Sequence, residues 1–203
     1  MENRKRGTVA VLFGICLVGI LACIGQSYYA RYEATRLERT LAKLTVGVTT
    51  EHDAKEALRP FRAEADKIGG RVQNTEAWGP EYAVTSRGLS ILHLARPVRF
   101  SIGTVFNNGI LVRKVVGLRI GNGSDCCFYE VTQSTTSFAD LPPNLMHEGV
   151  FVRKKNGFAH IYIDAEAPPD TETTAFDVDV ACLTSIAGCS RIDQILPTFK
   201  HFE

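Results

Sequence analysis

Apolar residues run without interruption along the start of the chain. From Thr8 to Ala30 there are 23 consecutive residues without a formal charge, directly behind the basic tripeptide Arg4-Lys5-Arg6. A helix of that length measures about 35 Å, which is enough to cross a bilayer core of about 30 Å. Aromatic rings favour the boundary between membrane and water, and three tyrosines lie at the far end of the run. These are Tyr28, Tyr29 and Tyr32. The pattern predicts a transmembrane segment over residues 8–30, which binds the lipid bilayer, behind a basic tip at residues 1–7.

Three outcomes are open for this segment. An uncleaved signal anchor that holds the basic tip in the cytoplasm is favoured, because no clean cleavage site with small residues is present. A cleaved signal peptide is the second outcome. The third is a lipoprotein signal, because Ile20-Leu21-Ala22-Cys23 is similar to a bacterial lipobox. In that case Cys23 would carry the lipid.

Residues 31–70 are predicted to form a helical stalk and a second helix. Apolar residues recur at spacings of four and three, as in a coiled-coil seam. They are Ala30, Ala34, Leu37, Leu41 and Leu44. Because two heptads are too few for a coiled coil, the pattern favours a helix that lies on its own domain.

The second helix is expected over about residues 51–67. Glycine and β-branched residues at 46–50 end the first helix. Thr50, followed by Asp53, is typical of an N-cap and its reciprocal partner. Pro60 lies inside the expected helix and predicts a kink or a break.

From residue 71 to 203 the pattern predicts an exported β-rich domain. The expected strands are rich in β-branched and aromatic residues. They cover residues 89–94, 98–106, 110–120, 127–131, 150–154, 158–163 and 176–180. Asn108-Gly109 and Asn156-Gly157 predict hairpin turns, and residues 190–196 predict a short closing helix. The fold class is therefore α+β, with an N-terminal transmembrane and stalk helix before a mainly antiparallel sheet.

The cysteines indicate the compartment. Two of the six, Cys16 and Cys23, lie in the apolar run, and four lie beyond it without metal-ligand spacing. Such usage fits an oxidising compartment, so the domain is expected outside the cytoplasm, in a periplasm or the cell exterior. Cys182 and Cys189 are expected to form a disulfide. The adjacent pair Cys126-Cys127 is left either reduced or joined in a strained ring.

Composition narrows the possible partners. The 203 residues carry a net charge of +1, which argues against a nucleic-acid partner that binds by bulk electrostatics. Basic residues in the expected strands, among them Arg113, Lys114 and Arg119, favour the wet face of a sheet or protection of an edge strand. The remaining expectation is an envelope protein partner of unknown identity.

No catalytic motif, cofactor loop or metal-ligand spacing is found in the sequence. The five histidines form no H-x-x-x-H or H-x-H pair. An enzyme would need His93 and His160 to converge with Asp164 or Asp177, because catalytic groups must lie within hydrogen-bond reach or one water away. The preferred hypothesis has no cofactor, no metal and no catalytic residues.

Two families resemble parts of the chain. Arg4-Lys5-Arg6-Gly7 and the apolar helix behind it resemble type IV pilins and pseudopilins, which combine a basic leader, an apolar helix, a stalk, a β-sheet domain and a late disulfide loop. The resemblance implies a filament or secretion component, although Thr8 stands where the family has an aromatic residue and Leu12 where it has a glutamate. Residues 44–49 with Leu58-Arg59-Pro60 look like small outer-membrane lipoproteins of the SmpA/OmlA kind.

The function expected from these observations is non-enzymatic. The chain is interpreted as a single-pass, membrane-anchored envelope protein whose exported β domain binds or scaffolds another component. The alternatives are a pilin-like component of a filament or secretion system, and an outer-membrane-type lipoprotein lipidated at Cys23.

Overall fold

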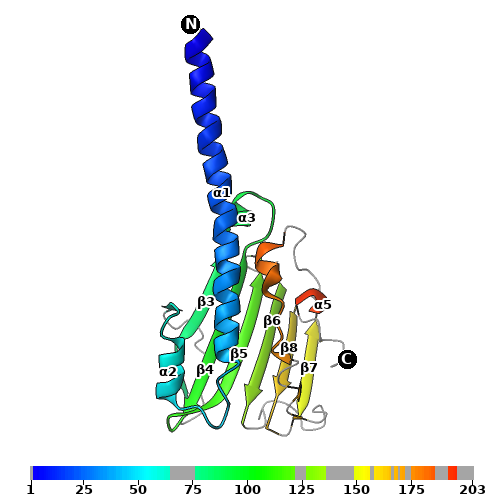
Figure 1. Ribbon diagram of the computed structural model, residues 1–203. Coiled ribbons are helices and arrows are strands. Elements are labelled where there is room, and N and C mark those ends of the chain that lie inside the picture. Colours follow the sequence, from blue (N-terminus) through cyan, green and yellow to red (C-terminus); the bar gives the residue numbers. More distant parts are fainter. Residues whose placement is uncertain are drawn as a thin grey trace.

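A long helix and a twisted sheet make up the molecule. The computed structural model describes residues 2–64, 76–121, 127–135, 149–155, 158–165, 167–168, 170–171, 175–185 and 192–195. Helix α1 (Glu2–Leu41) has 40 residues, and its carboxyl-terminal half lies on one face of the sheet while its amino-terminal half projects beyond it (Figure 1). The predicted α+β class is confirmed.

The described residues form an eight-stranded sheet. Its strands are β1 (Ala63–Glu64), β2 (Glu76–Trp78), β3 (Glu81–Ser86), β4 (Val98–Asn107), β5 (Ile110–Ile120), β6 (Cys127–Ser134), β7 (Val150–Lys155) and β8 (Phe158–Ile163). The order across the sheet is β1-β3-β4-β5-β6-β8-β7, and β2 pairs with β4. Only β6 and β8 run parallel within this part of the chain, so the sheet is mixed but mainly antiparallel.

Local turn chemistry sets the central hairpin. Asn108 and Gly109 join β4 to β5 with φ of 50° and 76°. Positive φ at both central residues matches the right-handed twist of the flanking strands, which is why Asn-Gly is favoured there. The predicted turn is confirmed. β7 and β8 also pair as predicted, while Asn156 and Gly157 lie outside the described residues.

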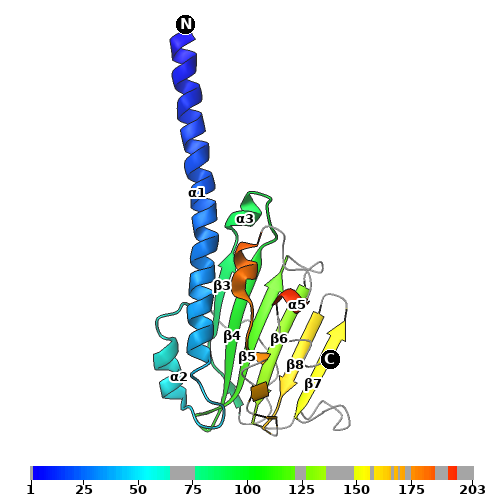
Figure 2. The same cartoon turned by 45° about the vertical axis from the view of Figure 1, so that its right-hand side comes forward.

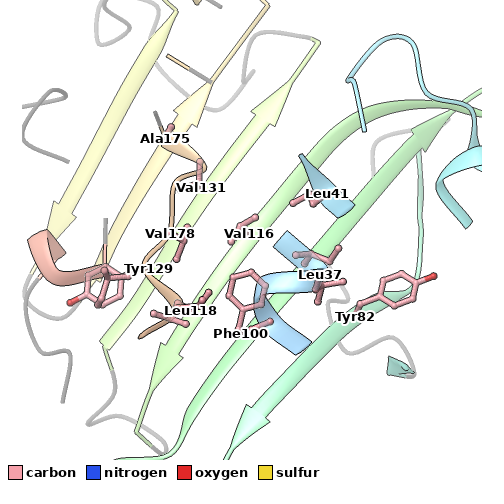
Figure 3. Packing of buried hydrophobic residues seen from close by; sticks show 14 of the residues in the cluster. Leu37, Leu41, Tyr82, Phe100, Val116, Leu118, Tyr129, Val131, Ala175 and Val178 are labelled. Atoms are coloured by element: carbon pink, nitrogen blue, oxygen red, sulfur yellow. The ribbon is translucent and has the colours of Figure 1, made fainter. Parts of the chain in front are cut away.

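The seam on the stalk packs against its own sheet. Ala34 and Leu37 are fully buried, and Ala30, Leu41 and Leu44 are at most 4% exposed. Figure 3 shows Leu37 and Leu41 beside the side chains of β3, β4 and β5. The helix therefore lies on its own domain, as the short heptad pattern favours.

Lys114 corrects the prediction of a wet face for the basic strand residues. It belongs to the face of the sheet that α1 covers and is only 2% exposed. Its Nζ donates to the carbonyl oxygen of Leu44 at 3.2 Å and lies 4.8 Å from the Phe176 ring. A cation just past the end of α1 complements the negative end of the helix dipole, which explains why a lysine is tolerated inside.

The second helix begins as predicted and is shorter than predicted. The Thr50 side chain accepts a hydrogen bond from the Asp53 amide at 3.1 Å and donates to its carboxylate at 2.7 Å, which caps α2 (Glu51–Leu58). The expected extension to residue 67 is wrong over the described residues, because the helix stops before Pro60 and β1 follows. Proline lacks the amide hydrogen that a continuing helix needs.

Two predicted strands are wrong. Residues 89–94 lie instead in α3 (Gly88–Ile91) and the turn after it, where α1 supplies hydrogen bonds that a local pattern does not reveal. Residues 176–180 lead into the 3-10 helix η3 (Val180–Thr184). The amides of Val178 and Asp179 donate to Glu38 and to the Ile195 carbonyl in place of a neighbouring strand. The expected closing helix is present as α5 (Ile192–Ile195).

Candidate functional site

The projecting half of α1 is the most unusual surface of the described structure. Its large apolar side chains are 42–70% exposed. They are Val11, Leu12, Phe13, Ile15, Leu17, Val18, Ile20 and Leu21. A helix that is apolar all round needs an apolar environment, either a protein core or a membrane. Among the described residues, α1 is the one helix long and apolar enough to span a membrane.

The projecting half ends where polar side chains attach α1 to the domain. The Gln26 amide oxygen accepts hydrogen bonds from the amides of Arg87 and Gly88 at 3.0 and 2.7 Å. Its nitrogen donates to the carbonyl oxygen of Thr85 at 3.0 Å. Ser27, which is fully buried, accepts from the Leu89 amide at 3.1 Å. Together these bonds join α1 to the end of β3 and the start of α3.

A glycine allows the two helices to approach closely. A Cβ atom at Gly88 would overlap the carbonyl oxygen of Cys23, and the Ser27 hydroxyl oxygen would lie 2.9 Å from it. Only glycine fits such an approach without a shift of backbone. The contact therefore fixes the position along α1 at which the helix leaves the domain. In Figure 2 this position lies at the level of α3.

The predicted span and the domain contact overlap. Ser27 and Ala30 belong to residues 8–30, yet they are 0% and 2% exposed because the domain covers them. The part of the run that is shown exposed is residues 11–22, about 18 Å of helix at 1.5 Å per residue. Sequence reasoning missed the junction, although Gln26-Ser27 are the first polar pair after the apolar run.

The three tyrosines face away from the domain near this junction. Tyr28, Tyr29 and Tyr32 are 59–64% exposed. The Arg36 guanidinium lies 5.6 Å from the Tyr32 ring and forms a 2.8 Å ion pair with Glu33. Rings with one polar end and an adjacent cation suit the headgroup level of a bilayer. Their place beside the junction agrees with the predicted interface end of the span.

The cysteines fall into two groups. Cys16 is exposed and Cys23 half-buried, and both have free thiols. Lipidation of Cys23 stays a prediction. Cys182 is buried and disulfide-bonded. Cys189 and the side chains of Cys126 and Cys127 lie outside the described residues, so the pairing of Cys182 with Cys189 also stays a prediction.

The structure separates the two histidines that the enzyme alternative needs. His93 is exposed in the turn after α3, with a φ of 56°, and not in a strand as expected. The turn that holds His93 leads into β4, whereas His160 is buried on β8. These two strands are three positions apart in the sheet, which is about 14 Å at the spacing of neighbouring strands. Asp177 faces Glu38 of α1, on the opposite side of the sheet from His160. No shared site forms from His93, His160 and Asp177.

His160 instead belongs to a polar contact within the sheet. Its Nε2 lies 2.8 Å from a Glu130 carboxylate oxygen and 2.9 Å from the Thr132 hydroxyl oxygen. A catalytic triad needs the carboxylate on one ring nitrogen and the nucleophile on the other. Because both partners meet the same nitrogen, the arrangement holds neighbouring strands together and cannot act as a relay.

Aromatic rings cover the same face of the sheet, the face turned away from α1. Phe128 stacks on Phe158 at 5.8 Å, and His160 stacks on Tyr162 at 3.6 Å. Phe151 lies 5.8 Å from Tyr162 across the neighbouring strand. Ring contacts of this kind stabilise the face of a sheet, and two of them, Phe128–Phe158 and Phe151–Tyr162, join neighbouring strands. The rings of Phe158 and Tyr162 lie against the buried His160 ring.

Comparisons with known proteins do not add to this description. Within the described part of the chain, no group of three or more His, Cys, Asp and Glu side chains is placed to hold a metal ion. No family model, curated protein or solved structure gives a significant match to the chain.

Proposed function

We propose that the chain is a non-enzymatic, single-pass membrane protein whose exported domain binds or scaffolds another envelope component. The observation that carries the proposal is the division of α1 into an exposed apolar half and an embedded half. One unbroken helix, bonded to the domain through Gln26 and Ser27, would hold the domain at a set distance and orientation from the bilayer.

Two observations support an exported domain. The basic tripeptide Arg4-Lys5-Arg6 precedes the apolar run and favours the cytoplasm for the amino terminus. The disulfide at Cys182 suits an oxidising compartment. A reporter enzyme that needs disulfides for activity, fused after Glu203, should be active in cells. An inactive but intact fusion would contradict the proposed orientation.

Membrane retention is tested by placing one charge inside the span. Leu17 lies near the middle of the apolar run and is 47% exposed. A Leu17→Arg substitution costs about 2.5–3.5 kcal/mol at the centre of a membrane helix. We expect this variant to shift from the integral membrane fraction to the alkali-extractable fraction. Val48→Arg, at a 70% exposed position in the domain, is the matched control and should stay integral.

A filament subunit is the second candidate function. The observation that favours it is that α1 continues from Glu2 to Leu41 without a break and leaves the domain as a bare apolar helix. That layout is the one implied by the resemblance to type IV pilins and pseudopilins. In such an assembly the projecting halves of neighbouring copies would cover one another. This chain has Leu12 at the position of the family's glutamate, so it would lack the charge that takes part in assembly of the family's filaments.

The exposed free thiol of Cys16 provides the test for this second function. Oxidation of the full chain in native membranes should link neighbouring copies through Cys16 if the projecting helices pack together. The dimer should disappear in Cys16→Ser and persist in Cys23→Ser. Monomers alone in the unsubstituted protein, with the anchor shown to be inserted, would contradict the filament subunit and leave the single-pass anchor standing.

A further inference from the structure

A second apolar surface lies where α1 leaves the domain. Ile91 and Leu94 are 65% and 45% exposed, and both belong to the connection between β3 and β4. We call residues 87–97 the α3 shoulder. In Figures 1 and 2 the shoulder lies beside α1 at the end of the sheet from which the apolar half projects. The only other large apolar side chain that the described domain exposes beyond residue 32 is Val48, which follows the opposite end of α1.

Hydrogen bonds fix the shoulder at a defined height on the helix. The Gln26 and Ser27 side chains bond the amides of Arg87, Gly88 and Leu89. The turn after α3 closes with two more bonds, from the His93 amide to the Ser90 carbonyl at 3.1 Å and from the Leu94 amide to the Leu89 carbonyl at 2.9 Å. These two bonds, together with the left-handed conformation of His93, form a Schellman motif. The shoulder is thus attached rigidly to α1 at Ser27.

The number of residues in α1 indicates where the shoulder would lie relative to the membrane. A bilayer core needs about 20 residues of helix. Counted from Thr8, the first residue after the basic tip, about 20 residues end at Ser27, whereas the part free of the domain ends at Ala22. The last turn or more of the span therefore lies level with α3. Tilt of the helix would lengthen the path and bring the shoulder still closer to the lipid.

Charge also suits a lipid surface. Between Arg87 and Pro97 the sequence has two arginines and a histidine, and no aspartate or glutamate. Arg87 and Arg96 are both exposed. Basic residues beside a span are attracted to anionic headgroups by about 1 kcal/mol each. Exposed apolar side chains flanked by arginines, as in the α3 shoulder, are typical of a surface that lies in the membrane interface.

We propose that the α3 shoulder is a second membrane contact, in which Ile91 and Leu94 enter the headgroup region of an anionic bilayer beside α1. This inference rests on the proposed single-pass anchor. The side chains would lie about 5–10 Å into the boundary between headgroups and acyl chains, as those of interfacial helices do. With α1 and the shoulder both in contact, the domain would be unable to rotate freely about its anchor.

Depth-dependent fluorescence quenching tests the proposal on the full chain. The sequence has one tryptophan, Trp78, so Trp78→Phe provides a dark background for single tryptophans at chosen positions. Ile91→Trp reports on the shoulder, Leu17→Trp on the anchor, and Val48→Trp is the matched control at a similarly exposed position of 70% against 65%. The protein is reconstituted in vesicles of phosphatidylethanolamine and phosphatidylglycerol with brominated acyl chains.

The outcomes separate the two proposals. Quenching of the tryptophans at 17 and 91, with no quenching at 48, is the expected result. Quenching at 17 alone would overturn the shoulder contact and leave the anchor standing. No quenching at 17 would overturn both. A second variant, Leu94→Trp, guards against a local defect at position 91 and should give the same result.

The lipid charge is tested in the same samples. Replacing phosphatidylglycerol with phosphatidylcholine should reduce quenching at 91 and leave quenching at 17 unchanged. Equal quenching at 91 in both lipid mixtures would overturn the assignment to an anionic bilayer.

Discussion

The two halves of α1 differ in how their apolar residues are distributed, and they have opposite surroundings. In the projecting half, apolar side chains point in all directions and remain exposed, whereas in the embedded half they recur every three or four residues and are buried. Charged residues such as Glu33, Arg36 and Arg39 occupy the other positions of the embedded half. A stripe of apolar residues along one side of a helix can be covered by the protein's own sheet, whereas a helix that is apolar all round needs an apolar environment on every side.

The largest expected difference between the halves concerns packing. Leu37→Ala removes a fully buried side chain between α1 and the sheet, so we expect the free energy of unfolding to fall by about 2–5 kcal/mol. Leu17→Ala, in the projecting half, should change it by less than about 0.5 kcal/mol. Denaturant unfolding of the full chain in detergent measures both. Equal losses would mean that the projecting half is also part of the folded core.

This contrast was within reach of sequence analysis because both patterns are local. The uncharged run predicts exposure to lipid, and the seam from Ala30 to Leu44 predicts contact with the domain. The hairpin at Asn108-Gly109 was predictable for the same reason, since two adjacent residues determine the turn. Strand β5 (Ile110–Ile120) has the predicted bounds.

The errors lie where distant residues decide the local structure. Residues 89–94 have the composition of a strand, but Ser27, 62 positions away, accepts the hydrogen bond that starts α3. Val178 and Val180 alternate like strand residues, yet the amides of Val178 and Asp179 donate to Glu38 and to the Ile195 carbonyl, and among the described residues they pair with no strand. The junction on α1 was missed for the same reason, because Gln26 has no partner close to it in sequence.

The second prediction addresses the boundary between the halves. Gln26→Ala leaves the amides of Arg87 and Gly88 without their acceptor, and we expect a loss of about 1–2 kcal/mol in the free energy of unfolding. Faster hydrogen exchange at these two amides should accompany it. Gly25→Ala, with open space around the new methyl group, is the control and should cause no loss. Unchanged exchange in Gln26→Ala would show that the boundary does not depend on this side chain.

The third prediction uses a titratable group that only the embedded half contains. The pKa of the Glu38 carboxyl is raised from 4.5 to about 7, chiefly by burial and also by the nearby charges of Asp177 and Asp179. The Val178 amide, which donates to it at 3.3 Å, and Arg39 act in the opposite direction. Because the folded state holds this proton more tightly than the unfolded state, the contribution of Glu38 to stability is greatest below pH 4.5 and is lost as the pH rises through about 7.

Glu38→Gln should remove that fall. Solvent screens a half-exposed carboxyl, so we expect a gain of about 1 kcal/mol at pH 8 and little change at pH 4. Unfolding experiments at the two pH values measure the difference. Glu33→Gln, on the same helix and paired with Arg36, is the control and should keep the pH dependence of the unsubstituted chain. A Glu38→Gln variant with the same slope as the unsubstituted chain would contradict the assignment.

The smallest expected effect concerns the α3 shoulder, which meets α1 where its two halves join. His93 adopts a φ of 56°, a left-handed conformation that glycine accepts more easily than histidine. His93→Gly should therefore raise the free energy of unfolding by about 0.5–1 kcal/mol, because relief of the left-handed strain exceeds the extra flexibility of the unfolded chain. His52→Gly, at an exposed position within α2, should lower it by a similar amount, because glycine is unfavourable inside a helix. Thermal unfolding of both variants compares the signs directly, and a loss of stability in both would show that the turn after α3 does not hold His93 in the left-handed region.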